Sequence, residues 1–456
     1  MRPLNQSRID LSAVIDAAPF VGLPLRVMVL SFLVMTIDGY DLQAMAFAAP
    51  ALSTQWHVAR ALLGPVLAAS IVGMAVGSIG FGALGDRIGR KRSLALCVGL
   101  LCIGSLASVF AVNLAELALC RVLTGLGLGG ATPLATALIA EWTPRRWRSA
   151  AVAVVIVGVP LGGTLGAALA AWLIPLHGWQ AVFLCGAALP AGLLALVLPV
   201  LPESPKYLAT RPGQRPALAA ALNALVREPR YSGHEAVVQE TATSSHSGRR
   251  GGFLLLFSST YWSTTLLLWS AFACNSLALY SFVNWLPTVL TSAGLPLKAA
   301  LRGSMFFNVG GMVGALLGSA LIYRYGSRRV GSTIALGGAV ATCLVGTLAV
   351  TSALGTGENA ELLLWVALSG AALNGMQNFL YVVAAHAYAT PIRALGVGCA
   401  STLARAGGVL SSVLGSAVFA WGLSARDFFY AIAAVIVVTT VSYRGVPLHI
   451  AARVTE

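Results

Sequence analysis

Apolar residues fill twelve long stretches of the chain, and polar segments separate them. The first six lie roughly at 24–49, 61–84, 93–112, 115–140, 149–174 and 179–201. Six more lie roughly at 261–290, 303–324, 330–353, 361–388, 394–421 and 428–446. Because a helix needs about 20 apolar residues to cross a bilayer, the pattern predicts an all-α membrane protein with twelve transmembrane helices.

One long polar segment divides this pattern into two halves. It runs from about 202 to 250 and contains RPGQRP, REPR and SSHSGRR, which are typical of a loop. We therefore predict an N-terminal six-helix half at 1–201, a central loop at 202–255 and a C-terminal six-helix half at 256–456.

The two halves share an internal repeat. VGMAVGSIGFGALGDRIGRKR in the first half recurs as VGGMVGALLGSALIYRYGSRR in the second. The matched residues are Gly73, Gly77, Arg87 and Gly89 in the first half and Gly310, Gly314, Arg324 and Gly326 in the second. Two similar halves related by an axis along the membrane normal are a transporter architecture, with the binding site at mid-membrane between them.

Composition excludes a soluble globule, since 57% of the residues are hydrophobic and only 10% are charged. Lys and Arg (29) outnumber Asp and Glu (15), but they cluster in alternate loops rather than on one nucleic-acid-binding face. They are Arg87, Arg90, Lys91 and Arg92 after the second stretch, Arg145, Arg146 and Arg148 after the fourth, Arg324, Arg328 and Arg329 after the eighth, and Arg393 after the tenth. By the positive-inside rule, these loops, the central loop and both termini are predicted to be cytoplasmic.

The sequence offers little other chemistry. The seven cysteines all fall within predicted spans, where disulfides are not expected. We find no nucleophile with a base, no metal-ligand cluster and no phosphate-binding loop, so neither an enzyme nor a cofactor is expected. The segment before the first span is polar to amphipathic, and we expect it to lie along the inner surface of the membrane.

Two carboxylates, Asp38 and Asp41, interrupt the first apolar stretch. A single Asp at the centre of an inserted helix is unfavourable by roughly 2.5 to 3.5 kcal/mol, so a function must offset the cost. Their spacing places both on nearly one helix face, and Gly39 permits close approach of a helix or ligand. Such a pair tends to hold one proton in a dry site. This predicts proton coupling, and Asp41 is favoured as the proton carrier because it lies deeper along the first helix from the cytoplasmic side.

Two arginines inside predicted spans need anions. Arg405, near the middle of the eleventh span, could hold a substrate carboxylate or pair permanently with Asp38 or Asp41. We expect it to be the counterpart of the two aspartates across the cavity. Arg121, in the fourth span, is expected to support coupling or gating, with substrate contact as the alternative.

Several motifs together resemble the major facilitator superfamily over nearly the whole chain. GALGDRIGRK at 82–91 is similar to its signature loop between helices two and three, RVLTGLGLGG to its fourth-helix pattern, and PESPKYL to its segment after helix six. DGYD at 38–41 resembles the DGxD signature of aromatic acid:proton symporters, and NWLPTVL, TPIRALGVG and LARAGGVL resemble other segments of that family. The resemblance implies the major facilitator fold and proton-coupled transport of an aromatic acid across a bacterial inner membrane.

The same resemblance implies gating at the cytoplasmic ends of the helices. The residues concerned are Gly82, Asp86, Arg87, Gly89, Arg90, Glu141 and Arg324. Asp86 is expected to cap a helix of the other half and to separate from it as the halves rock. Glu141 is expected to form a gate or loop salt bridge with the basic run after Pro144. Tyr323 replaces Asp86 in the second half, which predicts an asymmetric latch.

An aromatic substrate needs flat apolar walls with a few polar contacts. The candidate binding residues are Asn275, Tyr280, Phe282 and Asn284 on the seventh span, Phe306, Phe307 and Asn308 on the eighth, and Asn374, Gln377, Asn378 and Tyr381 on the tenth. On the tenth span, Asn374, Asn378 and Tyr381 form one polar stripe at helical spacing. Ordinary helix packing is the alternative for each residue, and His386 is assigned to packing or to a pH-sensitive role.

We therefore expect a monomeric symporter that imports a benzoate or hydroxybenzoate by alternating access, with the proton as its coupling ion. The alternatives are another organic acid such as muconate, nicotinate or a dicarboxylate, export instead of import, or a non-transporting chemoreceptor for aromatic acids. The expected partners are a small aromatic carboxylate and the lipid bilayer, and not nucleic acid.

Overall fold

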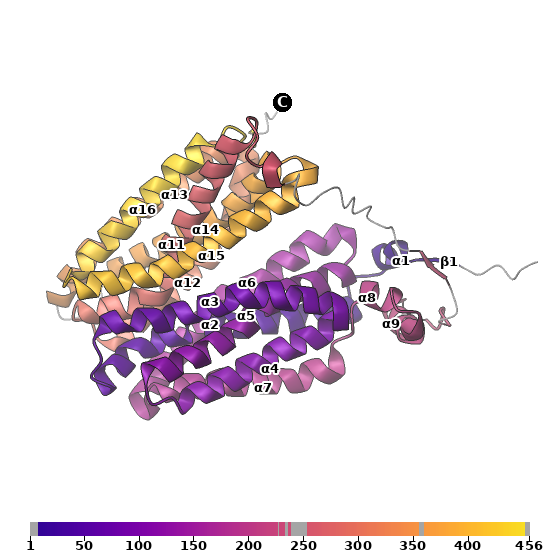
Figure 1. The fold of residues 1–456 in the computed structure, drawn as a ribbon, viewed down its shortest axis with the longest axis horizontal. Coiled ribbons are helices and arrows are strands. Elements are labelled where there is room, and N and C mark those ends of the chain that lie inside the picture. Colours follow the sequence, from indigo (N-terminus) through magenta and orange to yellow (C-terminus); the bar gives the residue numbers. More distant parts are fainter. Residues whose placement is uncertain (1–7, 227, 233–235, 239–252, 355–359, 452–456) are drawn as a thin grey trace, which may run out of the picture.

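The structure is a computed structural model and describes residues 8–226, 228–232, 236–238, 253–354 and 360–451. Two bundles of six long helices dominate this part of the chain (Figure 1). The N-terminal half contains α2 (Leu23–Gln55), α3 (Gly64–Ile88), α4 (Arg90–Val109), α5 (Leu114–Trp142), α6 (Arg145–His177) and α7 (Gln180–Val200). The C-terminal half contains α11 (Trp262–Ser292), α12 (Leu297–Tyr325), α13 (Ser327–Leu354), α14 (Ala360–Ala387), α15 (Thr390–Ala420) and α16 (Ala425–Gly445). The predicted all-α, twelve-helix fold is confirmed.

The helices differ from the apolar stretches in detail. Within the described residues, eleven of them are long and apolar enough to cross a membrane. The exception is α14, whose three amides Asn374, Gln377 and Asn378 lower its mean hydropathy, although its 28 residues are long enough. Several helices also begin earlier than their apolar stretch, because a polar first turn leaves its unbonded N–H groups near solvent.

Glycines give the internal repeat a structural meaning. A Cβ added to Gly73 or Gly77 would lie 2.4 or 2.1 Å from a carbonyl oxygen of α5. A Cβ added to Gly310 or Gly314 would lie 1.9 or 2.1 Å from a carbonyl oxygen of α14. Small residues let two helix backbones approach closely inside a membrane. The repeat therefore builds the same contact twice, α3 on α5 and α12 on α14.

The central segment carries structure that the polar pattern did not predict. It contains α8 (Pro205–Ala209), α9 (Arg215–Val226) and β2 (Ala236–Val238), and β2 pairs in parallel with β1 (Arg8–Asp10) near the N-terminus. The next helix, α1 (Leu11–Ala17), begins after Asp10, whose carboxylate caps its first turn. Apolar residues of α1 and α9 join one core with residues of α2, α5 and α7. These segments therefore cover one end of the N-terminal half.

The two halves meet in the middle and at one end. We call the end that carries α1, α8 and α9 the basic end (Figure 1). In the middle, α6 packs on α12 and α3 packs on α15. At the opposite end, the short helix η1 (Arg60–Leu63) packs on α15, and a Cβ on Gly64 would collide with the Ser416 side chain. The ribbons of the halves diverge toward the basic end (Figure 1).

Candidate functional site

A buried ion pair lies inside the N-terminal half. Arg121 Nη1 of α5 lies 3.5 Å from Asp41 Oδ1 of α2, and both side chains are fully buried. Ser105 of α4 donates to the same carboxylate oxygen at 2.6 Å, and Arg121 Nη2 donates to Ser108 at 2.9 Å. The guanidinium also lies over the Phe183 ring, 4.7 Å from its centroid. The charges are thus held by hydrogen bonds and an aromatic face, away from solvent.

The counterpart of Asp41 is therefore Arg121, and the expectation that Arg405 fills this role is wrong for this structure. The physical reason is position: α5 packs directly on α2, whereas Arg405 lies on α15 of the other half. Arg405 Nη1 instead donates to Ser78 Oγ of α3. Among the described residues, no carboxylate lies within salt-bridge distance of Arg405. It is a partly exposed cation where the two halves meet.

Asp38 has a different environment from Asp41. Its side chain is buried, Thr132 Oγ1 lies 3.4 Å from its Oδ2, and its Oδ1 has no hydrogen-bond partner in the described part of the chain. Between the two aspartates, a Cβ on Gly39 would lie 1.9 Å from the Val159 carbonyl oxygen of α6. Gly39 therefore serves helix packing. Neighbouring helices cover both carboxylates, so the expected common opening into one cavity is not observed.

Polar side chains of α11 and α14 form a second cluster, in the C-terminal half. Asn275 Nδ2 donates to Gln377 Oε1 at 2.7 Å, and Ser276 Oγ donates to the same oxygen at 3.3 Å. The predicted stripe of Asn374, Asn378 and Tyr381 lies on α14, and neither these side chains nor Gln377 is fully buried. This face of α14 therefore presents amides and a phenol rather than an apolar surface.

Two tyrosines, Tyr381 of the stripe and Tyr280 of α11, contact α15, the helix that carries Arg405. The Tyr381 hydroxyl donates to Ser401 Oγ of α15 at 3.4 Å. A Cβ on Gly408 of α15 would lie 3.1 Å from the Tyr280 ring, and Tyr280 interacts electrostatically with Arg405, Tyr381 and Asp38. The structure thus brings the predicted cation, two aromatic rings and the amides together around α11, α14 and α15.

A pair of buried amides joins the two halves. Gln43 Nε2 of α2 donates to Asn308 Oδ1 of α12 at 3.0 Å, and Asn308 Nδ2 donates back to Gln43 Oε1 at 3.0 Å. We call these residues the interhalf amide pair. A Cβ on Gly163 of α6 would lie 2.0 Å from Gln43 Nε2. The sequence interpretation assigned Asn308 to substrate and missed Gln43, although an amide two residues after Asp41 in an apolar span was a usable signal.

Other predicted binding residues lie elsewhere. Asn284 is buried and lies 3.5 Å from two serine hydroxyls of α15. Phe282 and Phe307 are buried and stack with their ring centroids 5.0 Å apart. Phe306 is 42% exposed on the same outward stripe as Val309. These four predicted side chains therefore pack helices or face outward, apart from the polar cluster.

At the basic end, polar contacts tie the α3–α4 turn to its own half. Arg90 Nη2 lies 3.0 Å from Glu141 Oε1, and Ser204 donates to the other oxygen of Glu141. Glu203 accepts the backbone N–H of Lys91 at 2.9 Å. Glu141 thus forms a loop salt bridge, but with Arg90 rather than with the basic run after Pro144. The serine and acid of the PES segment were not predicted to take part.

The remaining predicted gating residues surround this turn or its repeat. Gly89 has a φ of +104°, which favours glycine, and a Cβ there would collide with Glu203. Asp86 is largely exposed and lies 3.7 Å from Arg90 of its own half, so it does not cap the other half here. The Arg87 carbonyl oxygen accepts a hydrogen bond from the Arg211 side chain. A Cβ added to Gly82 would meet no described atom within 4 Å. Arg324 is exposed, and its guanidinium lies over the Tyr325 ring. The side chain of Tyr323 lies outside the described part.

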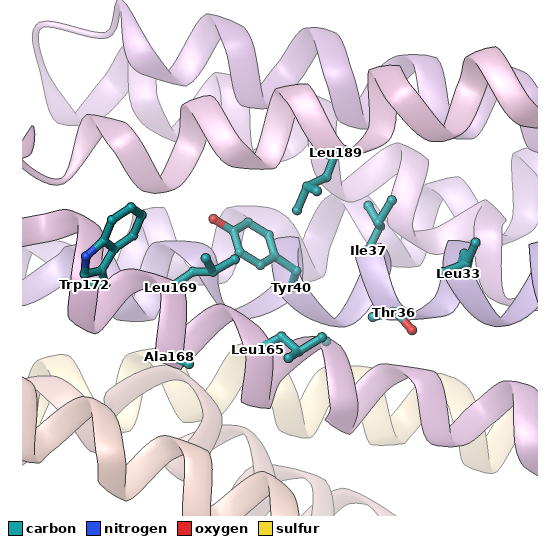
Figure 2. Close-up of a pocket in the computed structure, with 10 residues that line it drawn as sticks. Leu33, Thr36, Ile37, Tyr40, Leu165, Ala168, Leu169, Trp172 and Leu189 are labelled. Atoms are coloured by element: carbon teal, nitrogen blue, oxygen red, sulfur yellow. The ribbon is translucent and has the colours of Figure 1, made fainter.

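A groove of about 540 Å³ lies between α2, α6 and α7. Figure 2 shows Tyr40 at its centre, with Leu33, Leu165, Trp172 and Leu189 around it. These four surrounding side chains are exposed, and the Tyr40 hydroxyl turns away to donate to the Val182 carbonyl at 2.7 Å. The groove is thus an apolar outward surface and lacks the charged groups of the polar clusters.

Comparison with known proteins agrees with this architecture. The profile of the Major Facilitator Superfamily matches residues 31–356. A D-xylose-proton symporter has the same fold, with a TM-score of 0.71, 18% identity, and coverage of 93% of this chain and 98% of that one.

Curated relatives match along almost the full length. The gallate transporter of Pseudomonas putida is 37% identical over 425 residues, covering 93% of this chain and 92% of the relative. The 4-hydroxybenzoate transporter PcaK of Pseudomonas aeruginosa is 35% identical over 416 residues, covering 91% and 90%. The benzoate transport protein of Acinetobacter baylyi is 28% identical over 411 residues, covering 89% and 86%. The chain therefore belongs to the Major Facilitator Superfamily of membrane transporters, in the branch of its aromatic acid:proton symporters.

Proposed function

We propose that the protein is a proton-coupled symporter that imports a benzoate or hydroxybenzoate across a bacterial inner membrane by alternating access. The observation that carries this proposal is a buried Asp41–Arg121 pair in one half together with a cation between the halves, Arg405, which forms no salt bridge with any described residue. The names of the relatives, which are transporters of gallate, 4-hydroxybenzoate and benzoate, support the choice of an aromatic acid.

The substrate carboxylate binds Arg405. A guanidinium matches a carboxylate in a bidentate geometry. Arg405 is partly exposed, donates to the Ser78 hydroxyl, and has no carboxylate within salt-bridge distance in the described part of the chain. The rings of Tyr280 and Tyr381 provide aromatic surface beside it. Amides of the α14 stripe then meet ring hydroxyls, because a site built to hydrogen-bond a hydroxyl discriminates against an analogue that lacks it.

The proton binds Asp41. Arg121 and a proton compete for the same carboxylate, because protonation of Asp41 removes the charge that holds the guanidinium. Release of Arg121 would free the side chains of α4 and α7 that now enclose it. Since α2 also carries Gln43, a change at Asp41 reaches the interhalf amide pair through two residues of the same helix.

The orientation follows from charge. Basic residues concentrate in the turns at the basic end, which the positive-inside rule assigns to the cytoplasm. At the opposite end η1 packs against α15, while Arg90 and Glu141 at the basic end bond within their own half. This arrangement corresponds to the inward-facing state, and the interhalf amide pair must separate for the outward-facing state to form.

The test is uptake by proteoliposomes that contain the purified protein. Radiolabelled benzoate, 4-hydroxybenzoate, gallate, nicotinate and muconate are supplied with and without an inward proton gradient. We expect gradient-stimulated uptake of a phenolic benzoate, with excess unlabelled substrate as the control for leak. Uptake that does not respond to the gradient would exclude symport, preference for muconate or nicotinate would exclude the substrate class, and saturable binding without uptake would indicate a receptor.

A further inference from the structure

The groove between α2, α6 and α7 opens outward from the N-terminal half. Tyr40 lies at its centre, and Leu165 of α6 and Leu189 of α7 lie on either side of that ring (Figure 2). The two leucines are 48% and 43% exposed. All three helices are long and apolar enough to cross a membrane, so the groove opens toward the hydrocarbon of the bilayer. An acyl chain is therefore the kind of group that fits it.

One face of α2 continues the groove toward the basic end. Leu33, which lines the groove, precedes Tyr40 by seven residues, and Arg26 precedes Leu33 by another seven. Seven residues make about two helical turns, so the three side chains share one face of α2. Val29, which is 46% exposed, lies between Arg26 and Leu33 on this face. An exposed apolar path thus leads from the groove to a cation.

Arg26 is available to an anion. Its side chain is exposed, and no carboxylate lies within salt-bridge distance of it in the described part of the chain. It precedes Gly39, the middle residue of α2, by about 13 residues, or roughly 20 Å at helical rise. The hydrocarbon core of a bilayer is about 30 Å thick, and the whole bilayer is about 40–45 Å thick. Arg26 therefore lies in the headgroup layer, where a guanidinium meets lipid phosphates.

Two aromatic rings mark the same depth. Phe20, which precedes α2, stacks on Trp147 in the first turn of α6, with ring centroids 6.3 Å apart. Trp147 is 48% exposed, and tryptophan is enriched where a membrane meets water. This pair lies at the end of the bundle where α2 and α6 begin, as Arg26 does. The aromatic pair therefore supports the assignment of Arg26 to the headgroup layer.

The distance from Arg26 to the centre of the groove matches the length of one lipid. Arg26 and Tyr40 are about 14 residues apart, or roughly 21 Å along α2. One leaflet with its headgroup layer is about 20–22 Å thick. A phospholipid whose phosphate binds Arg26 therefore extends its acyl chain past Val29 and Leu33 to the Tyr40 ring. A zwitterionic headgroup carries a cation beside its phosphate, so the guanidinium favours a lipid with net negative charge.

We propose that the groove and Arg26 form a binding site for one anionic phospholipid of the leaflet at the basic end. The phosphate binds Arg26, and an acyl chain lies between Leu165 and Leu189. The chain packs against Tyr40, whose hydroxyl bonds to the Val182 carbonyl oxygen of α7. The bound lipid thus supports the packing of α2, α6 and α7 from outside the bundle, and the site does not depend on the proposed transport.

Native mass spectrometry of the full-length protein tests the headgroup contact. The protein is released from detergent that contains equal amounts of phosphatidylglycerol and phosphatidylcholine with the same acyl chains, and the readout is the ratio of the two in the one-lipid complex. We expect the wild type to retain mainly phosphatidylglycerol. Arg26→Gln should lower this ratio about fivefold, since one basic residue near the membrane surface is lost. Arg329→Gln is the matched control, because Arg329 is an exposed arginine in the first turn of α13, and it should leave the ratio unchanged.

A second pair of variants tests the acyl-chain contact. Leu189→Trp fills the groove and should reduce the retention of both lipids, whereas Leu336→Trp, at a leucine of α13 that is 47% exposed, should not. Equal retention of the two lipids by the wild type, or an unchanged ratio in Arg26→Gln, would overturn the proposal. So would a lipid-free dimer that Leu189→Trp dissociates, because the groove would then be an interface between two copies of the chain. If Leu189→Trp does not fold, the two arginine variants still decide.

Discussion

The Asp41–Arg121 pair allows a quantitative test. Asp41→Asn preserves the shape of the side chain and leaves Arg121 buried without a counterion. At the observed 3.5 Å and an effective dielectric constant of about 20, two unit charges attract by ~5 kcal/mol. Removing one partner of a buried pair typically costs about 3–5 kcal/mol, since the other charge stays desolvated. We expect Asp41→Asn to lower the free energy of unfolding by that amount.

Asp38→Asn is the matched control. It is the same substitution one turn away on α2, but among the described residues Asp38 bonds to the Thr132 hydroxyl and forms no salt bridge. We expect its free energy of unfolding to stay within about 1 kcal/mol of the wild type. The double variant Asp41→Asn, Arg121→Gln removes both charges and should recover most of the lost stability.

Denaturant unfolding of the purified variants in detergent measures these differences, and proteoliposome uptake measures their effect on transport. Asp41→Asn should abolish uptake driven by a pH gradient. The reasoning would fail if Asp41→Asn and Asp38→Asn were equally stable, if the double variant were no more stable than Asp41→Asn, or if Asp41→Asn still used the gradient.

Three further predictions follow from other contacts. Gly163→Ala should break the interhalf amide pair, lower the free energy of unfolding by about 1–3 kcal/mol and lower the melting temperature. Gly192→Ala is the control, because a Cβ added at Gly192 has no other atom within 4 Å in the described structure and should leave the melting temperature unchanged. Equal melting temperatures of the two variants would contradict this. Arg405→Lys should weaken the binding of an aromatic carboxylate at least about tenfold by calorimetry, since the bidentate fork is lost; unchanged affinity would remove Arg405 from the site. Glu141→Gln should lower the free energy of unfolding by about 1–3 kcal/mol in thermal unfolding, because Arg90 loses the nearer of its two carboxylates and keeps only the exposed Asp86. The exposed Glu116→Gln should be neutral, and similar losses in both would argue against the basic-end contact.

The helices and the repeat could be predicted because hydropathy and glycine spacing are local signals. Apolar runs near 20 residues define spans directly, and the repeated glycines mark where a second helix backbone approaches. The exception, α14, shows the limit of this signal, since the amides that interrupt its hydropathy also make it a candidate for the site.

The partners of the charged residues could not be predicted in the same way. Both Arg121 and Arg405 lie inside spans, and depth alone suits either as a partner for Asp41. The partner depends on which helices are neighbours and which side of each helix faces the other. Helix α5 packs on α2 and brings Arg121 to Asp41, whereas α15 packs on α3 and brings Arg405 to Ser78. Such choices depend on tertiary packing. Gln43, Ser105 and Ser78 were missed because a single polar residue in a span is also an ordinary packing residue.

The two polar clusters lie in different halves of the protein, and this has a consequence for how such a protein can change. The buried acids lie in the N-terminal half, whereas the amide and tyrosine cluster lies on α11 and α14 of the C-terminal half. Under the proposed function, substitutions on α14 would change which ring substituents are accepted, while the buried acids stay intact. Related transporters could then differ in their range of aromatic substrates through changes in one bundle, while the proposed proton site in the other bundle stays the same.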